Sequence, residues 1–165
     1  MTILKISEED RIARLNELGI LDTPHDLMFR SLAEQALEVF PGTSVAAISL
    51  VDTDRQWFKS IVGLDVKETP REASFCSHTI QTDGIMVVED ATADRRFAEI
   101  PLVTSSPRVR FYAGVRLMNG VGALCVMGAQ PRRPTETELA KLSKLARLVE
   151  IQLLSHGTIH NLNKR

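Results

Sequence analysis

A cysteine and a histidine lie two positions apart in the segment SFCSH, as Cys76 and His78. Ser74 is a favoured residue at the start of a helix, so we expect a short helix with both side chains in its first turn. The positive end of a helix lowers the pKa of a thiol, and a nearby imidazole can assist. The pair therefore fits a redox-sensing thiol, a nucleophile or two metal ligands. The structural alternative is a cysteine packed as a small apolar residue and a histidine satisfied by a backbone carbonyl.

The second thiol of the chain is Cys125, which falls in a segment expected to be a buried strand. A structural zinc site needs four ligands at suitable spacing, and Cys-x-His supplies two of them. We therefore expect no metal site. A disulfide relay would need a resolving thiol within reach of Cys76, and the strand context of Cys125 does not indicate one.

Arg110 and Tyr112 share one side of an alternating segment, residues 110–117, which predicts a strand. An arginine in the middle of a covered strand is costly unless its charge is paired. We expect Arg110 to pair with Asp90 or Asp94, or with the carboxylate or phosphate of a ligand.

Length and composition indicate one domain, residues 1–165. The chain has 165 residues, of which 44% are apolar, with 20 basic and 21 acidic side chains and a formal net charge of −1. This balance argues against a nucleic acid or an anionic membrane as partner. No apolar run is long enough to span a bilayer, and the acidic start lacks a signal-peptide core. We expect a cytoplasmic protein.

Three long helices are expected to position these residues, at about 7–19, 25–40 and 135–155. Pro24 suits the first turn of the second helix, with Asp22 or Thr23 as its cap. The third begins in a capping box formed by Thr135 and Glu138. The residues after Ser155 are expected to fray.

The last of these helices has two neighbouring apolar stripes. The first consists of Leu139, Leu142, Ala146, Val149 and Leu153. Leu145 and Leu148 lie beside it. One stripe could cover the sheet while the other meets a partner helix, or both could belong to one wide core face.

Short apolar or alternating segments predict five strands, at 44–52, 56–62, 86–89, 110–117 and 121–129. Alternation in 56–62 puts Trp57, Lys59 and Ile61 on one side. Asn119-Gly120 is a strong hairpin signal. Residues 63–72 read as a loop, and 99–108 as a mobile loop. The sum is an α+β fold, with an antiparallel sheet of five or six strands, the long helices on one face, and short helices and loops on the other.

The segment DTDRQWFKSIVGLDVKETPREASFCSH, from Asp52 to His78, holds the only tryptophan. Together with VVEDATADRRF, PRVRFYAGVRL and GALCV followed by PRRP, it resembles bacterial GAF sensor domains, of the type found before histidine kinases and diguanylate cyclases. The resemblance covers about 11–151, which it implies to be the core of the domain. The resemblance implies the strand order 2-1-5-4-3, counted along the chain. It also implies a ligand pocket on the face opposite the terminal helices.

Alternation then assigns side chains to that pocket. If Phe58 and Phe111 face the helices, Trp57, Arg110 and Tyr112 face the pocket, roofed by the segment around Cys76. The predicted ligand-binding residues are Trp57, Phe75, Cys76, His78, Arg110 and Tyr112. An aromatic or carboxylated metabolite, entering behind the 99–108 loop, would suit this set.

The resemblance implies a regulatory module that senses a small molecule in bacterial signal transduction, with no catalysis of its own. One alternative is a thiol-based redox sensor, or an enzyme like the free methionine sulfoxide reductases, acting through Cys76. The glycine-cysteine-glycine pattern of that reductase group is missing here. The other alternative is a dimerisation scaffold without a ligand.

The expected partners are an unidentified small molecule and a second copy of the chain, joined through the terminal helices. Family members often precede a kinase or a cyclic-dinucleotide enzyme. We expect this chain either to act on a separate kinase or cyclase output protein or to be a fragment. The sequence specifies no cofactor.

Overall fold

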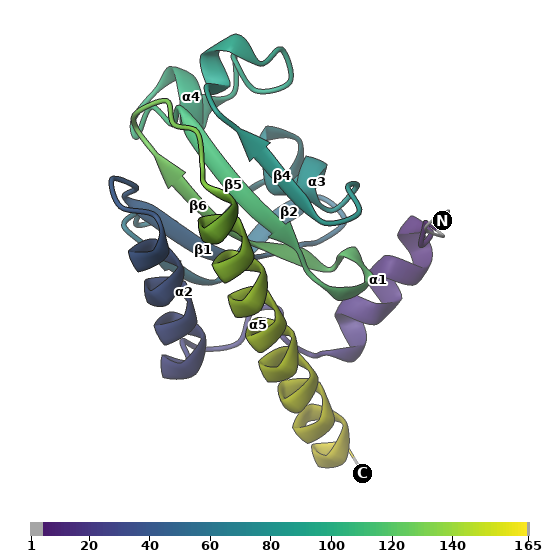
Figure 1. Ribbon diagram of the computed structural model, residues 1–165. Helices are drawn as coiled ribbons and strands as arrows, with labels where there is room; N and C mark the ends of the chain where they lie inside the picture. The colour runs from purple at the N-terminus through teal and green to yellow at the C-terminus, as the bar shows by residue number, and fades with distance from the viewer. Residues whose placement is uncertain (1–4, 165) are drawn as a thin grey trace.

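The computed structural model describes residues 5–164 and shows a six-stranded antiparallel sheet with helices on both faces (Figure 1). The strands are β1 (Val45–Val51), β2 (Arg55–Val62), β3 (Glu68–Pro70), β4 (Ile85–Val88), β5 (Phe111–Arg116) and β6 (Gly122–Gly128). Their order across the sheet is β3-β2-β1-β6-β5-β4. The order predicted for the five sequence-derived strands is confirmed, and the fold is α+β.

The sixth strand, β3, lies at the edge of the sheet in a segment that the sequence predicted as loop. It has three residues and pairs only with Arg55, Gln56 and Trp57 of β2. A strand this short shows no alternation, and Pro70 is tolerated because it sits at an edge. Local pattern therefore could not identify it.

Three long helices cover one face: α1 (Glu8–Glu17), α2 (Leu27–Val39) and α5 (Glu136–Asn163). The other face carries the short helices α3 (Cys76–Thr79) and α4 (Pro101–Thr104), with single 3-10 turns at Arg71–Ala73 and Ala91–Ala93. A third 3-10 turn, Met118–Gly120, joins β5 to β6. There Asn119 and Gly120 adopt φ of +57° and +64°, as the hairpin signal predicts.

The sheet separates two apolar cores. Alternate residues of β1 divide between them: Ala46, Ile48 and Leu50 face the long helices, while Val45, Ala47 and Val51 face the short ones. We call these the helix-side core and the loop-side core. The helix-side core also contains Leu15, Phe29, Phe111, Val126, Val149 and Leu153. The loop-side core also contains Phe58, Phe75, Phe97, Tyr112, Cys125 and Met127.

A bulge in β2 breaks the alternation predicted for that strand. The register with β1 shifts between Ile48 and Ser49, so that Lys59 is an extra residue. Lys59 Nζ donates to Thr23 Oγ1 at 2.9 Å and to the carbonyl of Pro24. Beyond the bulge the sides exchange. Ile61 consequently packs on the loop-side core, not with Trp57 as predicted.

Two helix boundaries differ from the sequence prediction. The cap of α2 is Asp26, whose side chain accepts from the amides of Met28 and Phe29, and not Asp22 or Thr23. At the other end of the chain, α5 continues to Asn163 and does not fray after Ser155.

The last turns of α5 are held by the end of α1. Asn161 Nδ2 donates to the carbonyl of Glu17 at 3.1 Å. His156 Nε2 lies 3.2 Å from the carbonyl oxygen of Gly19. The helix predicted at about 7–19 is found: Ser7 caps its start, and Gly19, with φ of +59°, follows its end. The capping box of Thr135 and Glu138 is also present.

Across residues 5–164, no helix combines the length and the apolar character needed to cross a membrane.

Candidate functional site

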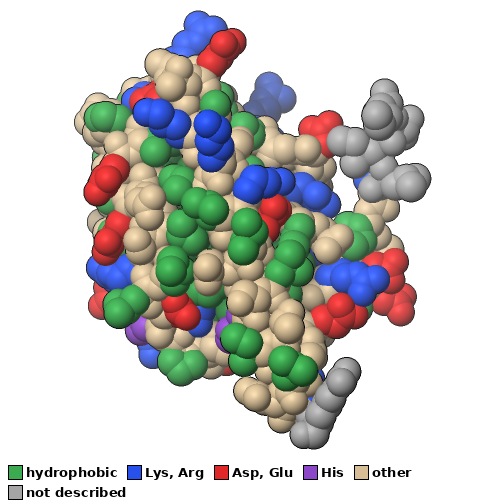
Figure 2. All heavy atoms as spheres, turned by 60° about the horizontal axis from the view of Figure 1, so that its bottom comes forward, with side chains coloured by type: hydrophobic (Ala, Val, Ile, Leu, Met, Phe, Trp, Pro, Cys, Tyr) green, Lys and Arg blue, Asp and Glu red, His purple; other side chains and the backbone are tan. Residues whose placement is uncertain are grey.

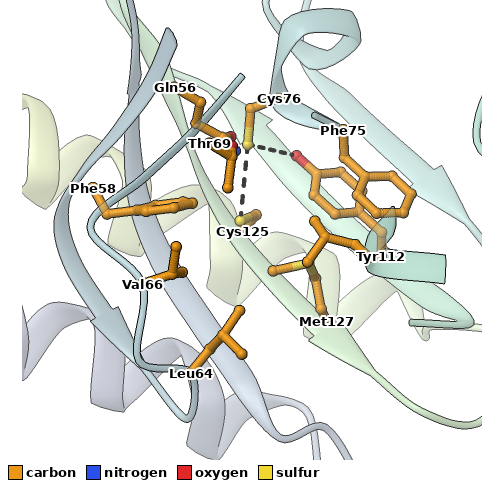
Figure 3. A pocket seen from close by; sticks show the side chains of 11 residues that line it. Gln56, Phe58, Leu64, Val66, Thr69, Phe75, Cys76, Tyr112, Cys125 and Met127 are labelled. Atoms are coloured by element: carbon orange, nitrogen blue, oxygen red, sulfur yellow. Dashed lines mark hydrogen bonds between the residues drawn. The ribbon is translucent and has the colours of Figure 1, made fainter. Parts of the chain in front are cut away.

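A small pocket lies in the loop-side core, between the sheet and the short helices (Figure 3). Its lining residues are aromatic, aliphatic, sulfur-containing or neutral polar, and they are Gln56, Phe58, Leu64, Val66, Thr69, Phe75, Cys76, Leu102, Tyr112, Cys125 and Met127. The enclosed space is about 10 Å³. That is room for about one water molecule, so side chains nearly fill the pocket.

Two thiols meet at the floor of this pocket. Cys76 opens α3, and Cys125 points from β6 toward it, with 4.0 Å between the two Sγ atoms (Figure 3). Both cysteines are free and buried. The hydroxyl of Tyr112 lies 3.4 Å from Cys76 Sγ and 2.7 Å from Thr79 Oγ1. A polar cluster of sulfur and oxygen atoms is thus enclosed by apolar side chains.

The two thiols are not equivalent. A hydrogen bond with Cys125, followed by one with Tyr112, lowers the pKa of Cys76 against the opposing effect of burial. The bond with Cys76, together with burial, raises the pKa of Cys125 well above its ordinary value. Burial also raises the pKa of Tyr112 well above its ordinary value. Cys76 is therefore the thiol that ionises more readily.

Aromatic rings close one side of the pocket. Phe75 stacks on Tyr112 with 4.8 Å between ring centroids and an interplanar angle of 11°. Phe97 packs against Phe75 at 4.5 Å, and His78 meets Phe97 edge-on at 4.9 Å. These contacts fix α3 to β5.

The polar groups of the pocket are already hydrogen-bonded. Ser49 Oγ donates to Gln56 Oε1 at 2.8 Å, and Gln56 Nε2 donates to Thr69 Oγ1 at 2.9 Å. This chain of bonds links β1, β2 and the edge strand β3. None of the residues found to line the pocket carries a formal charge as Lys, Arg, Asp or Glu.

Three of the six predicted site residues line the pocket: Phe75, Cys76 and Tyr112. The predicted convergence of all six is wrong. Trp57 belongs to the helix-side core, on the same face as its β1 partner Leu50. Alternation established that Trp57 and Phe58 oppose each other but not which of them faces the helices, and it is Phe58 that lines the pocket.

Arg110 and His78 take structural positions. Arg110 Nη1 donates to the carbonyls of Val103 at 3.0 Å and Val109 at 3.1 Å, in place of the predicted aspartate or ligand partner. It thereby holds the segment that carries α4. His78 packs on Phe97, and burial, followed by the nearby Arg96, lowers its pKa.

Sequence reasoning missed Phe58, Cys125 and Met127. The sequence held a usable signal for two of them. A hairpin centred on Asn119-Gly120 places Met127 opposite Tyr112, as observed, and Cys125 lies on the same side by alternation. Leu64, Val66 and Leu102 come from segments with no periodic pattern. Only the tertiary structure brings those three to the pocket.

A second hollow, of about 540 Å³, lies between α1 and the end of α3. Its arginines are engaged within the protein. Arg11 donates to Glu8 and to the carbonyls of Val51 and Gly120, and Arg71 donates to Glu8. Hydrogen bonds from Arg11 and then Arg71 lower the pKa of Glu8 to about 2. This network of hydrogen bonds holds α1 against the edge of the sheet, and we call it the joint between α1 and the sheet edge.

Among residues 5–164, no three histidine, cysteine or acidic side chains gather in a way that could hold a metal ion.

No protein-family model matches the chain. Solved structures do match it. The GAF domain of an Acinetobacter phosphoenolpyruvate-protein phosphotransferase superposes with a TM-score of 0.61 at 18% identity, over 98% of this chain and 99% of that one. The chain has the GAF fold. A free methionine-R-sulfoxide reductase from Neisseria meningitidis, solved with its substrate, superposes with a TM-score of 0.64 at 22% identity, over 97% and 99% of the two chains.

In sequence, this chain is 42% identical over 147 residues to a cyclic di-GMP phosphodiesterase of Pseudomonas aeruginosa. The match covers 86% of this chain and 25% of that protein. The chain therefore spans about a quarter of the curated relative that it matches.

The prediction that the module carries no catalysis of its own is contradicted by these comparisons. A relative in sequence is named as a phosphodiesterase, and a neighbour in fold is a methionine sulfoxide reductase. Enzymes therefore stand among the proteins similar to this chain, both in sequence and in fold.

Proposed function

We propose that this chain is a sensory GAF domain that binds a small, largely apolar molecule in its loop-side pocket and regulates cyclic di-GMP hydrolysis. The observation that carries the proposal is the pocket itself, built from Phe58, Phe75 and Tyr112 around a floor of two thiols. Ligand pockets are typically apolar with a few placed polar groups, and Gln56 and Thr69 are such groups here.

The lining favours a neutral ligand. A carboxylate or phosphate in this pocket would lose its hydration without meeting a cation among the lining residues. Arg110 and His78, which the sequence suggested as orienting groups, are engaged elsewhere. The carboxylated metabolite expected from the sequence is thus replaced by an uncharged aromatic or aliphatic one.

Binding requires the pocket to open, because the enclosed space is about 10 Å³. The half-buried wall residues Leu64, Val66 and Leu102 lie on the β2–β3 connection and on α4, outside the sheet's central strands. Displacing these three side chains would admit a larger molecule. A ligand shifts the domain only if it binds the open state more tightly than the closed one.

The strands that line the pocket also contact the long helices on the other face. Tyr112 and Cys125 face the pocket, while their neighbours Phe111 and Val126 lie in the helix-side core with residues of α5. A shift of β5 and β6 would therefore reach α5. The 42% identity to a cyclic di-GMP phosphodiesterase supports cyclic di-GMP hydrolysis as the activity under control.

Binding is tested by thermal shift with a panel of neutral aromatic and aliphatic compounds. Leu102→Trp adds bulk at the pocket wall, and Leu27→Trp adds it at an exposed position on α2. We expect a compound that raises the Tm of the wild type and of Leu27→Trp, with the shift lost in Leu102→Trp. Val66→Trp repeats the test from another wall. Equal shifts in all four proteins would refute binding in this pocket.

A second function, self-association, is favoured by an apolar stripe on the outer face of α5. Its members are Leu148, Ile151, Leu154, Ile159 and Leu162, each between 47% and 58% exposed. The inner stripe of Leu142, Ala146, Val149 and Leu153 is fully buried. Figure 2 shows apolar side chains gathered on this side of the molecule.

A second copy of the chain, packing its own α5 along this stripe, would cover it. Light scattering after size exclusion tests the dimer. Leu148→Glu with Ile151→Glu should give a monomer, while Leu27→Glu with Met28→Glu, exposed residues at the start of α2, should leave the dimer unchanged. A wild type that is still monomeric at the highest concentration at which it stays in solution would exclude the dimer.

A further inference from the structure

The buried thiols Cys76 and Cys125 lie closer than their places in the sequence suggest. Their Sγ atoms are 4.0 Å apart, and both are free. A disulfide needs a separation of about 2.05 Å. Closing the gap therefore requires a movement of about 2 Å, and Cys76 begins a helix of only four residues, α3. Cys125, in the centre of the sheet, can remain where it is.

We propose that Cys76 and Cys125 form a dithiol switch that hydrogen peroxide converts to an intramolecular disulfide. This goes beyond ligand sensing and does not depend on it. The site consists of the two thiols, the hydroxyl of Tyr112 at 3.4 Å from Cys76 Sγ, and the small space beside them.

The reaction has two steps. Cys76 Sγ attacks one oxygen of the peroxide, the O–O bond breaks, and the thiol proton leaves with the departing oxygen as water. The product is a sulfenic acid on Cys76. Cys125 Sγ then attacks Cys76 Sγ, the S–O bond breaks, and the released hydroxide takes the Cys125 proton to form a second water. In sum, the two thiols lose two electrons and two protons to become a disulfide, and one hydrogen peroxide molecule is reduced to two waters.

The surroundings of the thiols assign the attacking role to Cys76. Hydrogen bonds with Cys125 and Tyr112 stabilise its thiolate, and its pKa is lowered. Cys125 has a raised pKa and lies on the sheet side of its partner. The thiolate is the nucleophile in such reactions, so Cys76 reacts first and Cys125 resolves the intermediate.

The size of the pocket selects the oxidant. The enclosed space beside the thiols is about 10 Å³, enough for a molecule about the size of water. Hydrogen peroxide is the smallest hydroperoxide. A bulky organic peroxide reaches the thiols only when Leu102 and its neighbours in the wall are displaced, whereas hydrogen peroxide needs much less opening of the pocket. The folded protein should therefore prefer hydrogen peroxide to cumene hydroperoxide more strongly than the unfolded chain does.

The experiment compares the two peroxides on the whole chain, both folded and in urea, and follows disulfide formation by mass spectrometry. The expected product of the folded protein is a loss of two hydrogen atoms, mapped to a Cys76–Cys125 link and reversed by dithiothreitol. The ratio of rates for hydrogen peroxide over cumene hydroperoxide should be at least tenfold larger in the folded protein. An equal ratio would mean that oxidation occurs only through unfolding, and would overturn the proposal.

Two variants separate the roles. Cys125→Ser should stop at the sulfenic acid on Cys76, captured by dimedone, and Cys76→Ser should leave Cys125 unmodified under the same conditions. Near-ultraviolet circular dichroism establishes that each variant is folded, and Cys125→Val and Cys76→Val replace any that is not. Reaction of Cys125 first, or no loss of hydrogen from the folded wild type at millimolar peroxide, would overturn the proposal.

Discussion

The hydroxyl of Tyr112 lies 2.7 Å from that of Thr79, and this bond ties strand β5 to helix α3 inside an apolar layer. Both side chains are fully buried. A hydrogen bond in such surroundings is strong, and its loss leaves a buried polar group without a partner. The position of α3, and with it that of Cys76, depends on this bond and on the stacking of Phe75 on Tyr112.

Tyr112→Phe should lower the free energy of unfolding by about 1–2 kcal/mol, because it removes the hydroxyl that bonds Thr79 and Cys76. Urea denaturation measures the change. Thr79→Val should be destabilising as well, and the double variant should cost less than the sum of the two. Strict additivity would show that the two hydroxyls are not coupled in solution.

Gly114→Ala should destabilise the protein by about 1–3 kcal/mol through overpacking. A Cβ at this position would lie 2.2 Å from the Tyr112 hydroxyl oxygen, so the ring would have to move. Gly84→Ala is the matched control, since a Cβ there meets nothing within 4 Å. If the two variants unfolded at the same urea concentration, the placement of Tyr112 would be wrong.

Gly19→Ala tests the docking of the last turns of α5 on α1. Gly19 has φ of +59°, and an added Cβ would lie 2.4 Å from the ring of His160. Both strain and clash should destabilise the protein, by about 1 kcal/mol or more in total. The double variant Gly19→Ala with His160→Ala lacks the ring. It should regain part of the lost stability, because only the backbone strain remains. No recovery in thermal unfolding would indicate that α5 ends before His160.

Acid should weaken the joint between α1 and the sheet edge. The pKa of Glu8 is about 2 in the folded protein, below its ordinary value of 4.5, because Arg11 and Arg71 stabilise the carboxylate. A lowered pKa contributes stability above pH 4.5 that is lost as the pH falls toward 2. Glu8→Gln should therefore flatten the dependence of unfolding free energy on pH in this window. Glu9→Gln, at an exposed neighbouring position, should leave the slope as in the wild type.

The fold could be predicted from the sequence because strands, caps and the Asn119-Gly120 hairpin are local signals, and the strand order followed from the GAF resemblance.

The site could be predicted only in part, since three of the six predicted residues line the pocket. Alternation showed that Trp57 and Phe58 oppose each other, but the choice between faces depends on pairing with Leu50, which is a tertiary contact. The bulge at Lys59 then reversed the sides for Ile61.

Two further features were beyond local pattern. The end of α5 is stabilised by Glu17 and Gly19, more than 130 residues away in the sequence, so its composition alone suggested fraying. The approach of Cys125 to Cys76 depends on how α3 lies over β6. The strand context of Cys125 did not indicate a second thiol within reach of Cys76, and the three-dimensional structure brings the two side chains together.

Control of cyclic di-GMP hydrolysis by the state of the loop-side pocket can be measured in a chimaera. This chain replaces the matching segment of the Pseudomonas aeruginosa phosphodiesterase, and hydrolysis is measured with and without a neutral compound that stabilises the chain. We expect at least a twofold change in rate, which is absent when the chimaera carries Leu102→Trp. An unchanged rate in the wild-type chimaera at saturating compound would contradict this control.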